Sequence, residues 1–360
     1  MKIALITLYD EIEGKVEFFN GFSFVKTDGD HIFLQVGKKV TIPEKYDRIL
    51  CSVSHRSDLL FVKDICDSRW VFGGPIVRHY SKEYLRKYFP NMKFYMGSIE
   101  EYLDIEREDI FIEYWKDWIF DYKPICFGYN ASCGSDCYWG KCIFCRVSGH
   151  KNDSRDIGNV FGSLPEYDFL THVHFRSGSM TPEELKYLIN CQERKPKKNT
   201  VFRIYLRGEK EILDIIKTSD DLSYLFLIVG LEGFTQMWID SLNKNLEIKT
   251  ILETGKIASE KGASICFSLM SMFPLMDNKI YNESLKTIDW IGDNLDPKKV
   301  HFYDSIYTNW LRPEVANSFG AYKIKDIGVF SLLTKEKKEM CTSLITKLQE
   351  KGFKVPTYPI

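Results

Sequence analysis

The sequence lacks both a charge excess and a long apolar run, and each absence excludes a class of protein. Its 49 basic and 50 acidic residues give a formal net charge of −1, which provides no basic surface excess for bulk nucleic-acid or membrane binding. No window approaches the roughly 20 apolar residues of a membrane span. A short apolar run near the start is followed at once by acidic residues, which predicts a first β-strand rather than a signal peptide. We therefore expect a cytoplasmic protein.

Internal repeats and low-complexity tracts are also absent, which excludes solenoid and fibrous architectures. The 360 residues, 44% of them apolar, suffice for two domains or for one large α/β domain with an extension. Ten cysteines are too few for a disulfide scaffold in a chain of this length. Half of them fall within residues 126–145, and such clustering is typical of a metal-binding loop in a reducing compartment.

The order of the expected elements predicts two α/β domains. Residues 2–9 form an apolar strand, and residues 15–42 alternate around a turn at 27–30, which predicts a β-hairpin. Strands and helices then alternate from 46 to 103, which predicts an open parallel sheet with a ligand crevice at its strand ends. The charged and aromatic stretch 104–123 is expected to join the two domains.

A second series of strands and helices follows. Strands are predicted at 124–129, 172–176, 201–206, 225–229, 264–270 and 300–303, with helices after most of them. In such a series the chemistry lies at the carboxyl ends of the strands. A last helix within 335–351 has an apolar stripe that is expected to cover these strands. We expect domains at 1–120 and 121–320 and a helical extension at 321–360.

The stretch 137–145, CYWGKCIFC, carries the clearest chemistry. Cys137, Cys142 and Cys145 are separated by four and two residues, so their thiolates lie on one short loop and can share a zinc ion or an iron–sulfur cluster. A structural zinc site needs four ligands, and Cys133 would be the fourth. A cluster with three protein ligands leaves one iron open. The loop also carries large rings that can flank a flat ligand by stacking, namely Tyr138, Trp139 and Phe144.

This loop resembles the cluster-binding loop of the radical S-adenosylmethionine (SAM) enzymes, in the branch whose barrel follows a cobalamin-binding-type domain. The resemblance implies a Rossmann-like module followed by a partial (β/α)6 barrel. It implies a [4Fe–4S] cluster on Cys137, Cys142 and Cys145, with Phe144 near the SAM adenine. Such enzymes cleave SAM reductively to methionine and a 5′-deoxyadenosyl radical, with an electron from a reductase, flavodoxin or ferredoxin. Cys133 in place of Cys137 stays an alternative ligand.

Two further segments resemble SAM-binding parts of that family. After the second barrel strand, Ser177, Gly178 and Ser179 occupy the place of a glycine-rich turn that approaches the SAM amino group, although an ordinary turn would read the same. Arg207 follows the third barrel strand. Its guanidinium suits the SAM carboxylate, and a surface arginine is the alternative.

The segment Gly230-Leu231-Glu232-Gly233 matches a GLES strand end of the same branch, with glycine in the serine place. The resemblance implies that Glu232 contacts the ribose or methionine end of SAM, and the alternative is an acidic residue at a helix start. Residues 243–245, NKN, fit the turn that follows.

The first domain matches cobalamin-binding domains less well. Its Gly73-Gly74-Pro75 turn resembles theirs, but a tight strand-to-helix turn would look the same. The DxHxxG motif that supplies a cobalt ligand is absent, because residues 9–15 contain no histidine and His31 stands at the wrong spacing. Either the domain binds cobalamin without a protein ligand or the pocket has been lost.

Cys266 is a candidate for the reaction itself. Alternation places Ser264, Cys266 and Ser268 on one face of a barrel strand. In the lumen, the thiol could give a hydrogen atom to a substrate radical; a buried structural cysteine is the alternative. We expect modification of a ribosomally made peptide, by epimerisation or crosslinking, ahead of cobalamin-dependent methylation of a small metabolite. A zinc-binding interaction protein is the alternative outside enzymes.

Overall fold

The computed structural model describes residues 1–12, 15–20, 22, 27–38, 41–53, 56–74, 77, 82–97, 99–106, 123, 126–129, 137–142, 157–175, 178–190, 199–273, 275–304, 321–323, 329–331 and 334–356. The chain divides into two compact units. The first comprises Met1–Ser135, Asp153–Arg176 and Glu193–Phe202, and the second comprises Asp136–Asn152, Ser177–Gln192 and Arg203–Ile360. The joining segment expected at 104–123 lies mostly outside the described residues.

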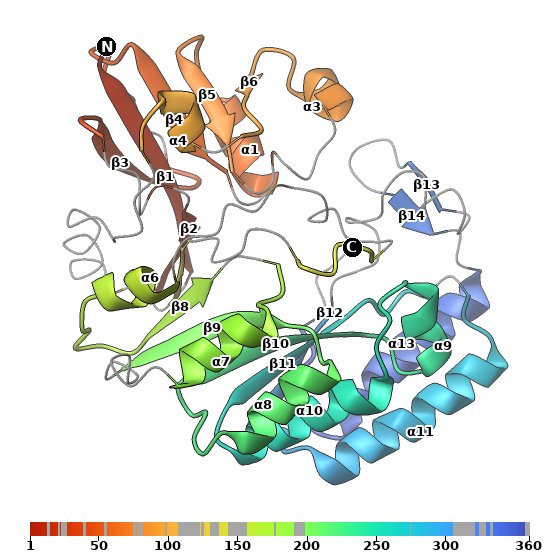
Figure 1. Cartoon of the computed structure of the whole chain (residues 1–360). Coiled ribbons are helices and arrows are strands. Elements are labelled where there is room, and N and C mark those ends of the chain that lie inside the picture. Colours follow the sequence, from red (N-terminus) through yellow and green to blue (C-terminus); the bar gives the residue numbers. More distant parts are fainter. Residues whose placement is uncertain are drawn as a thin grey trace. The chain divides into compact units, whose positions relative to one another are not determined.

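The first unit contains the predicted open parallel sheet. Its strands β1 (Ile3–Ile12), β4 (Arg48–Ser52), β5 (Trp70–Gly73) and β6 (Lys93–Phe94) are parallel neighbours in this order (Figure 1). Parallel strands that are buried on both faces are apolar throughout, and Ile6, Ile49 and Phe72 are each fully buried here. The helices of this region are α1 (Arg56–Lys63), α3 (Lys82–Tyr88) and α4 (Ile99–Leu103).

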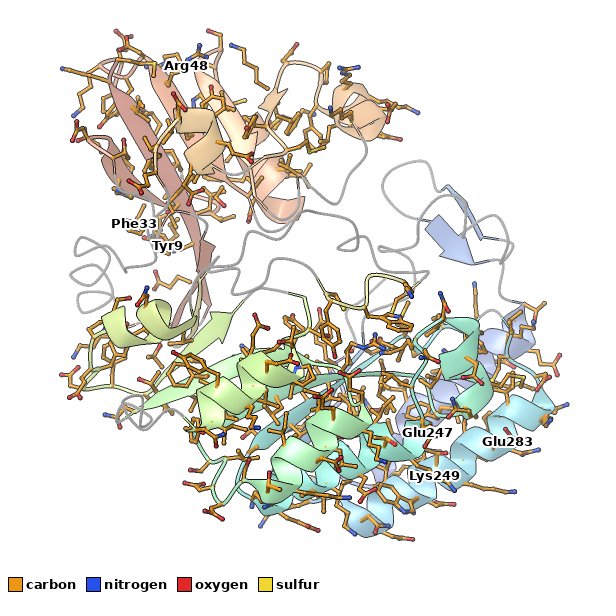
Figure 2. All side chains as sticks on the ribbon, viewed as in Figure 1. Tyr9, Phe33, Arg48, Glu247, Lys249 and Glu283 are labelled. Atoms are coloured by element: carbon orange, nitrogen blue, oxygen red, sulfur yellow. The ribbon has the colours of Figure 1, made fainter. Side chains whose placement is uncertain are left out.

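The hairpin predicted within residues 15–42 is wrong. β2 (Lys15–Asn20) runs antiparallel to β1, while β3 (Asp30–Gln35) pairs with β1 in parallel. β3 pairs with residues 4–9 of β1, and β2 pairs with residues 9–12 of the same strand. β2 and β3 therefore do not pair with each other along these residues. This pairing buries Leu34 in the core of the unit. Figure 2 labels Tyr9 on β1 and Phe33 on β3, two strands that are neighbours in this register.

The rest of the first unit continues the sheet from β2. β7 (Cys126–Tyr129) pairs in parallel with β2 and with β8 (Thr171–Phe175). Between them in the chain lies α6 (Ile157–Ser163), although the sequence of residues 153–167 is typical of a loop. With two glycines in seven residues, this helix shows no apolar periodicity that would have revealed it.

The second unit contains the later βα steps. β9 (Thr200–Leu206), β10 (Leu225–Glu232), β11 (Ser264–Leu269) and β12 (Val300–Asp304) are neighbours in this order, and the division between the units falls within β9. The helices are α7 (Pro182–Asn190), α8 (Lys210–Thr218), α9 (Gln236–Ser241), α10 (Ile248–Glu260), α11 (Asn278–Asn294) and α13 (Lys335–Glu350). α8 packs beside α10 and α11 beside α13 (Figure 1). A short antiparallel pair is formed by β13 (Ala321–Lys323) and β14 (Val329–Ser331).

The two faces of β11 differ as the alternation predicts. Ile265, Phe267 and Leu269 are fully buried, and Phe267 packs so closely on α10 that a Cβ added to Gly255 would lie 2.3 Å from its ring. Cys266 belongs to the opposite, half-buried face. The helix-covered face is therefore the outer one, and Cys266 lies on the inner face of the sheet.

The outer surface of the helices is polar, as expected for helices that cover a sheet. Lys249 on α10 is exposed and Glu283 on α11 is half-buried, and Figure 2 labels both among the helices of this unit. Among the described residues, no helix has the length and apolarity needed to cross a bilayer.

Candidate active site around the cysteine loop

The thiol of Cys137 lies among backbone donors. Burial raises its pKa, but N–H groups of Gly140, Trp139 and Ser179 and the charge of Arg207 act the other way and leave the pKa below its ordinary value. Such donors stabilise a thiolate, the form in which cysteine binds metals.

The turn at Gly178 lies directly against the cysteine loop. A Cβ on Gly178 would fall 2.1 Å from the backbone nitrogen of Cys137, a distance that no side chain can occupy. Glycine therefore allows the contact through which the Ser179 N–H reaches the Cys137 sulfur. The resemblance implies that Gly178 and Ser179 approach the SAM amino group, and in the structure both lie against Cys137. Ser177 lies outside the described residues.

Cys142 lies beside the same cations. It is 8% exposed, and burial raises the pKa of its thiol, while the charges of Lys244 and Arg207 lower it and those of Glu232 and Cys137 raise it. The two cysteines therefore lie close enough for their charges to interact. Cys145, Cys133 and Phe144 are outside the described residues. Within the described part of the chain no third metal-ligating side chain joins the pair.

Arg207 is buried at the centre of this region, with an exposure of 4%. Its Nη2 donates to the carbonyl oxygen of Lys244 at 2.5 Å, and its Nη1 donates to Sγ of Cys142 at 3.9 Å. The guanidinium carbon lies 4.6 Å from the centroid of the Trp139 ring, and Nε lies 3.7 Å from Oε2 of Glu209. The alternative of a surface arginine is therefore wrong, because the apolar and polar neighbours of this side chain exclude solvent.

Glu232 ends β10 in an unusual backbone conformation. Its φ is 62°, and the Gly233 N–H donates to the Leu231 carbonyl oxygen at 2.8 Å, which closes a three-residue turn around it. The register between β10 and β11 shifts at the same point. A γ-turn with positive φ is rare and strained, and such strain at a strand end is typical of functional sites. The turn directs the carboxylate inward, where it is 7% exposed.

Lys244 binds the Glu232 carboxylate. Sequence analysis assigned no role to this lysine. Its Nζ lies 3.1 Å from Oε1 of Glu232 and donates to the Gly230 carbonyl oxygen at 2.7 Å. The Ser268 hydroxyl donates to the same Oε1 at 3.2 Å. The available signal was its position between Asn243 and Asn245, since asparagine favours the left-handed backbone conformation that both residues adopt, with φ values of 54° and 52°.

Asn243 joins the same turn to the cysteine loop. Its side-chain amide donates to the Lys141 carbonyl oxygen at 2.9 Å, and its own carbonyl oxygen accepts from Nε1 of Trp139 at 3.0 Å. The cysteine loop, the β8–α7 turn and the α9–α10 turn thus meet around Cys137 and Cys142. The structure thus brings together the predicted site residues Cys137, Cys142, Gly178, Arg207 and Glu232, which are far apart in sequence.

Comparisons with solved structures show the fold that carries this site. No protein-family model and no curated protein sequence matches the chain. Among solved structures, the radical SAM methyltransferase TsrM from Kitasatospora setae, with cobalamin and a [4Fe–4S] cluster bound, superposes with a TM-score of 0.60 at 9% identity over 99% of this chain and 93% of that one. The chain has the fold of a cobalamin-type radical SAM enzyme.

A second radical SAM structure agrees. The cobalamin-dependent enzyme OxsB, with aqua-cobalamin and SAM bound, superposes with a TM-score of 0.53 at 11% identity over 98% of this chain. The chain spans 56% of the length of OxsB. The predicted fold, a Rossmann-like module followed by a partial (β/α)6 radical SAM barrel, is thus confirmed.

The GLES resemblance would place serine at position 233, where this chain has glycine, and Trp238 gives a physical reason for the glycine. A Cβ on Gly233 would lie 2.3 Å from the indole of Trp238. That indole is fully buried and stacks on Phe273 with 4.3 Å between ring centroids. The space for a side chain at position 233 is therefore filled by the tryptophan.

Cys266 has an imidazole for its neighbour on the inner face of the barrel strands. Cys266 and His301 are register partners on β11 and β12, and both are half-buried. Burial raises the pKa of Cys266 to about 11, with the Arg203 charge lowering it. Burial and the charge of Lys354 lower the pKa of His301. The thiol is therefore protonated and the imidazole neutral at pH 7. Sequence reasoning missed His301 because the register between strands is not visible in it.

Two observations test whether the first unit fits cobalamin. Ser52 ends β4 with an exposure of 5%, and its hydroxyl has no hydrogen-bond partner among the described residues. A Cβ on Gly74 (φ 99°) would lie 2.8 Å from that hydroxyl. A buried unpaired hydroxyl and a tightly packed glycine at the carboxyl ends of parallel strands fit a ligand-binding crevice. His31 lies within β3, and burial lowers its pKa to about 4.

Proposed function

We propose that the chain is a radical SAM enzyme. The observation that carries this proposal is the convergence on Cys137 and Cys142 of the Gly178 turn, Arg207 and the Glu232–Lys244 pair. The residues present fit an iron–sulfur cluster, because backbone N–H groups and two cations surround thiols that would carry negative charge. Cys137, Cys142 and Cys145 would hold a [4Fe–4S] cluster. When bound, this cluster would supply the electron that cleaves SAM to methionine and a 5′-deoxyadenosyl radical.

The SAM-binding residues belong to the same proposal. The backbone at Gly178 and Ser179, with Ser177, would lie near the SAM amino group, and Phe144 near its adenine. Glu232 would contact the ribose or methionine end, which suits a carboxylate that is already oriented by a buried lysine and a serine. The resemblance implies that Arg207 is the partner of the SAM carboxylate, but its terminal nitrogens already donate to Lys244 and Cys142.

The test uses protein purified without oxygen. We expect about four irons and four sulfides per chain and 5′-deoxyadenosine after reduction in the presence of SAM. Cys142→Ala should abolish 5′-deoxyadenosine formation, whereas Cys66→Ala, which removes a half-buried thiol from the first unit, should not. Zinc without iron would replace this proposal by the zinc-binding interaction protein, and SAM cleavage in Cys142→Ala would remove the ligand assignment.

For the reaction that follows SAM cleavage, we propose hydrogen abstraction from a ribosomally made peptide, leading to epimerisation or crosslinking. The inner-face position of Cys266 supports epimerisation, because a protonated thiol can return a hydrogen atom to a substrate radical. The thiyl radical that remains regains a thiol by taking one electron from the reductase, flavodoxin or ferredoxin donor and one proton from solvent. Such an enzyme would act in the cytoplasm.

A second candidate is cobalamin-dependent methylation of a small metabolite. The buried hydroxyl of Ser52 beside Gly74, which has no partner in the described part of the chain, favours it, because those residues could line a corrinoid crevice without a histidine ligand to cobalt. Mixing the protein with hydroxocobalamin, followed by gel filtration and a visible spectrum, separates the two. Stoichiometric retention that Ser52→Val weakens would put methylation first, while no retention would leave hydrogen abstraction without methyl transfer.

A further inference from the structure

Arg207 contacts Lys244, Cys142, Trp139 and Glu209, and each of its terminal nitrogens has one hydrogen-bond partner among them. Nη2 donates to the Lys244 carbonyl oxygen and Nη1 donates to the Cys142 sulfur. One face of the guanidinium lies over Trp139 at 4.6 Å. A bidentate grip on a carboxylate needs two adjacent N–H groups of the fork to be available together. In this arrangement each terminal nitrogen already has one partner within the chain, so a bidentate grip through both would compete with these contacts. Nε is buried and has no hydrogen-bond partner among the described residues.

The contact with sulfur has an electrostatic consequence. Hydrogen bonds to the sulfurs of an iron–sulfur cluster and the charge of its surroundings set the reduction potential. Reduction adds one electron, and hence one negative charge, to the cluster and its thiolates. A cation that donates an N–H to a ligand sulfur stabilises the reduced state more than the oxidised state, and at 4% exposure water screens Arg207 only weakly.

We propose that Arg207 is a positioning residue that raises the reduction potential of the [4Fe–4S] cluster through its N–H contact with the Cys142 sulfur, and that it does not bind the SAM carboxylate. This inference rests on the proposed function, since it needs the cluster on Cys137, Cys142 and Cys145. It assigns to Arg207 the task of making a difficult electron transfer easier.

Glu209 moderates the effect of this arginine. Its Oε2 lies 3.7 Å from Nε of Arg207, and its Oε1 accepts a hydrogen bond from the Tyr138 hydroxyl. The carboxylate therefore offsets part of the guanidinium charge a few ångströms from the sulfur. Removing the charge of Glu209 should raise the potential, while removing the charge of Arg207 should lower it. A purely structural role for the arginine predicts no such opposite signs.

The experiment is a redox titration of the anaerobically reconstituted full chain without SAM, followed by the electron paramagnetic resonance signal of the reduced cluster. In Arg207→Gln we expect the equilibrium constant for reduction by a fixed donor to fall at least about tenfold, which for a one-electron couple is about 59 mV. Glu209→Gln, which can still accept from Tyr138, should shift the potential in the opposite direction. Arg207→Lys should give an intermediate value, because it keeps the charge and loses the fork.

Arg203→Gln is the matched control, since it removes the same charge from the same strand. Arg203 lies with its guanidinium carbon 4.8 Å from the Phe226 ring and acts on the Cys266 thiol, so its loss should leave the potential unchanged. Unchanged potentials in both Arg207→Gln and Glu209→Gln, with four irons bound, would overturn the inference. A loss of SAM affinity in Arg207→Gln with an unchanged potential would restore the carboxylate role. Absence of iron from the wild-type protein would instead overturn the proposed function.

Discussion

The ammonium group of Lys244 lies 3.1 Å from a carboxylate oxygen of Glu232, and the two side chains are 5% and 8% exposed. Burying both charges costs several kcal/mol per ion before their attraction is counted. The ion pair is therefore weak evidence for stability of the fold. Its effect is to fix the position of the Glu232 carboxylate, at a strained strand end next to Cys142.

Replacement of Lys244 tests that placement. Lys244→Met should destabilise the chain by about 3–5 kcal/mol, because it leaves the Glu232 carboxylate buried without its counter-charge. The double variant Lys244→Met/Glu232→Gln should recover much of this loss, since no charge then stays buried. Urea unfolding followed by circular dichroism measures both. Lys249→Met, which removes an exposed lysine from α10, should change stability by less than about 0.5 kcal/mol. Equal losses in the single and double variants would show that the pair is not coupled.

Gly178 should be irreplaceable for cluster binding. In Gly178→Ala the new methyl group would require the Cys137 backbone to move, because 2.1 Å is far below any van der Waals contact. We expect iron content after reconstitution to fall at least about tenfold, in the range seen for residues that orient metal ligands. Gly162→Ala is the control, since nothing lies within 4 Å of a Cβ there, and it should bind iron normally. Full iron loading in Gly178→Ala would show that the loop can be rearranged at little cost.

His31 should make the first unit sensitive to acid. Burial lowers its pKa to about 4 from 6.5, so between these values the unfolded chain binds a proton that the folded chain does not. The free energy of unfolding is therefore highest above pH 6.5. It decreases by up to about 3 kcal/mol as the pH falls toward 4, because protonation of His31 favours the unfolded chain. Hydrogen exchange of β1 and β3 amides at pH 7 and pH 4.5 measures it. His31→Gln should reduce this pH dependence, and an unchanged profile would assign it to other groups.

Cys266 should matter for turnover and not for SAM cleavage. If its thiol returns the hydrogen atom, Cys266→Ala should produce 5′-deoxyadenosine at the wild-type rate but no epimerised product. Cys341→Ala, which removes a fully buried thiol from α13, serves as a control on the loss of a cysteine. Unchanged epimer formation in Cys266→Ala would leave Cys266 as a packing residue.

The sequence predicts most of the strands and helices, because their patterns are local. The alternation in 264–269 correctly separates the inner and outer faces of β11, since a strand has a period of two residues. The partner of β3 could not be predicted in this way. Alternation specifies which residues share a face, while the choice of β1 as partner depends on contacts across 26 positions, as in the pairing of Leu8 with Leu34.

The residues of the candidate site also fall into those that local sequence could predict and those that it could not. Cys137, Gly178 and Glu232 could be placed from sequence because they fall in short motifs at strand ends. Lys244 and His301 could not, because their importance comes from neighbours on other elements: Glu232 across a turn, and Cys266 across a strand register. The burial of Arg207 could not be predicted either, since only the packing of Trp139 and Cys142 around it distinguishes it from a surface arginine.

The packing of Trp238 against Gly233 has a consequence for the residues that these two positions can hold together. Because the indole occupies the volume that a side chain at 233 would need, serine at 233 and tryptophan at 238 exclude one another. Homologues with tryptophan at 238 should therefore carry glycine at 233, and a search pattern that demands serine at 233 would overlook them.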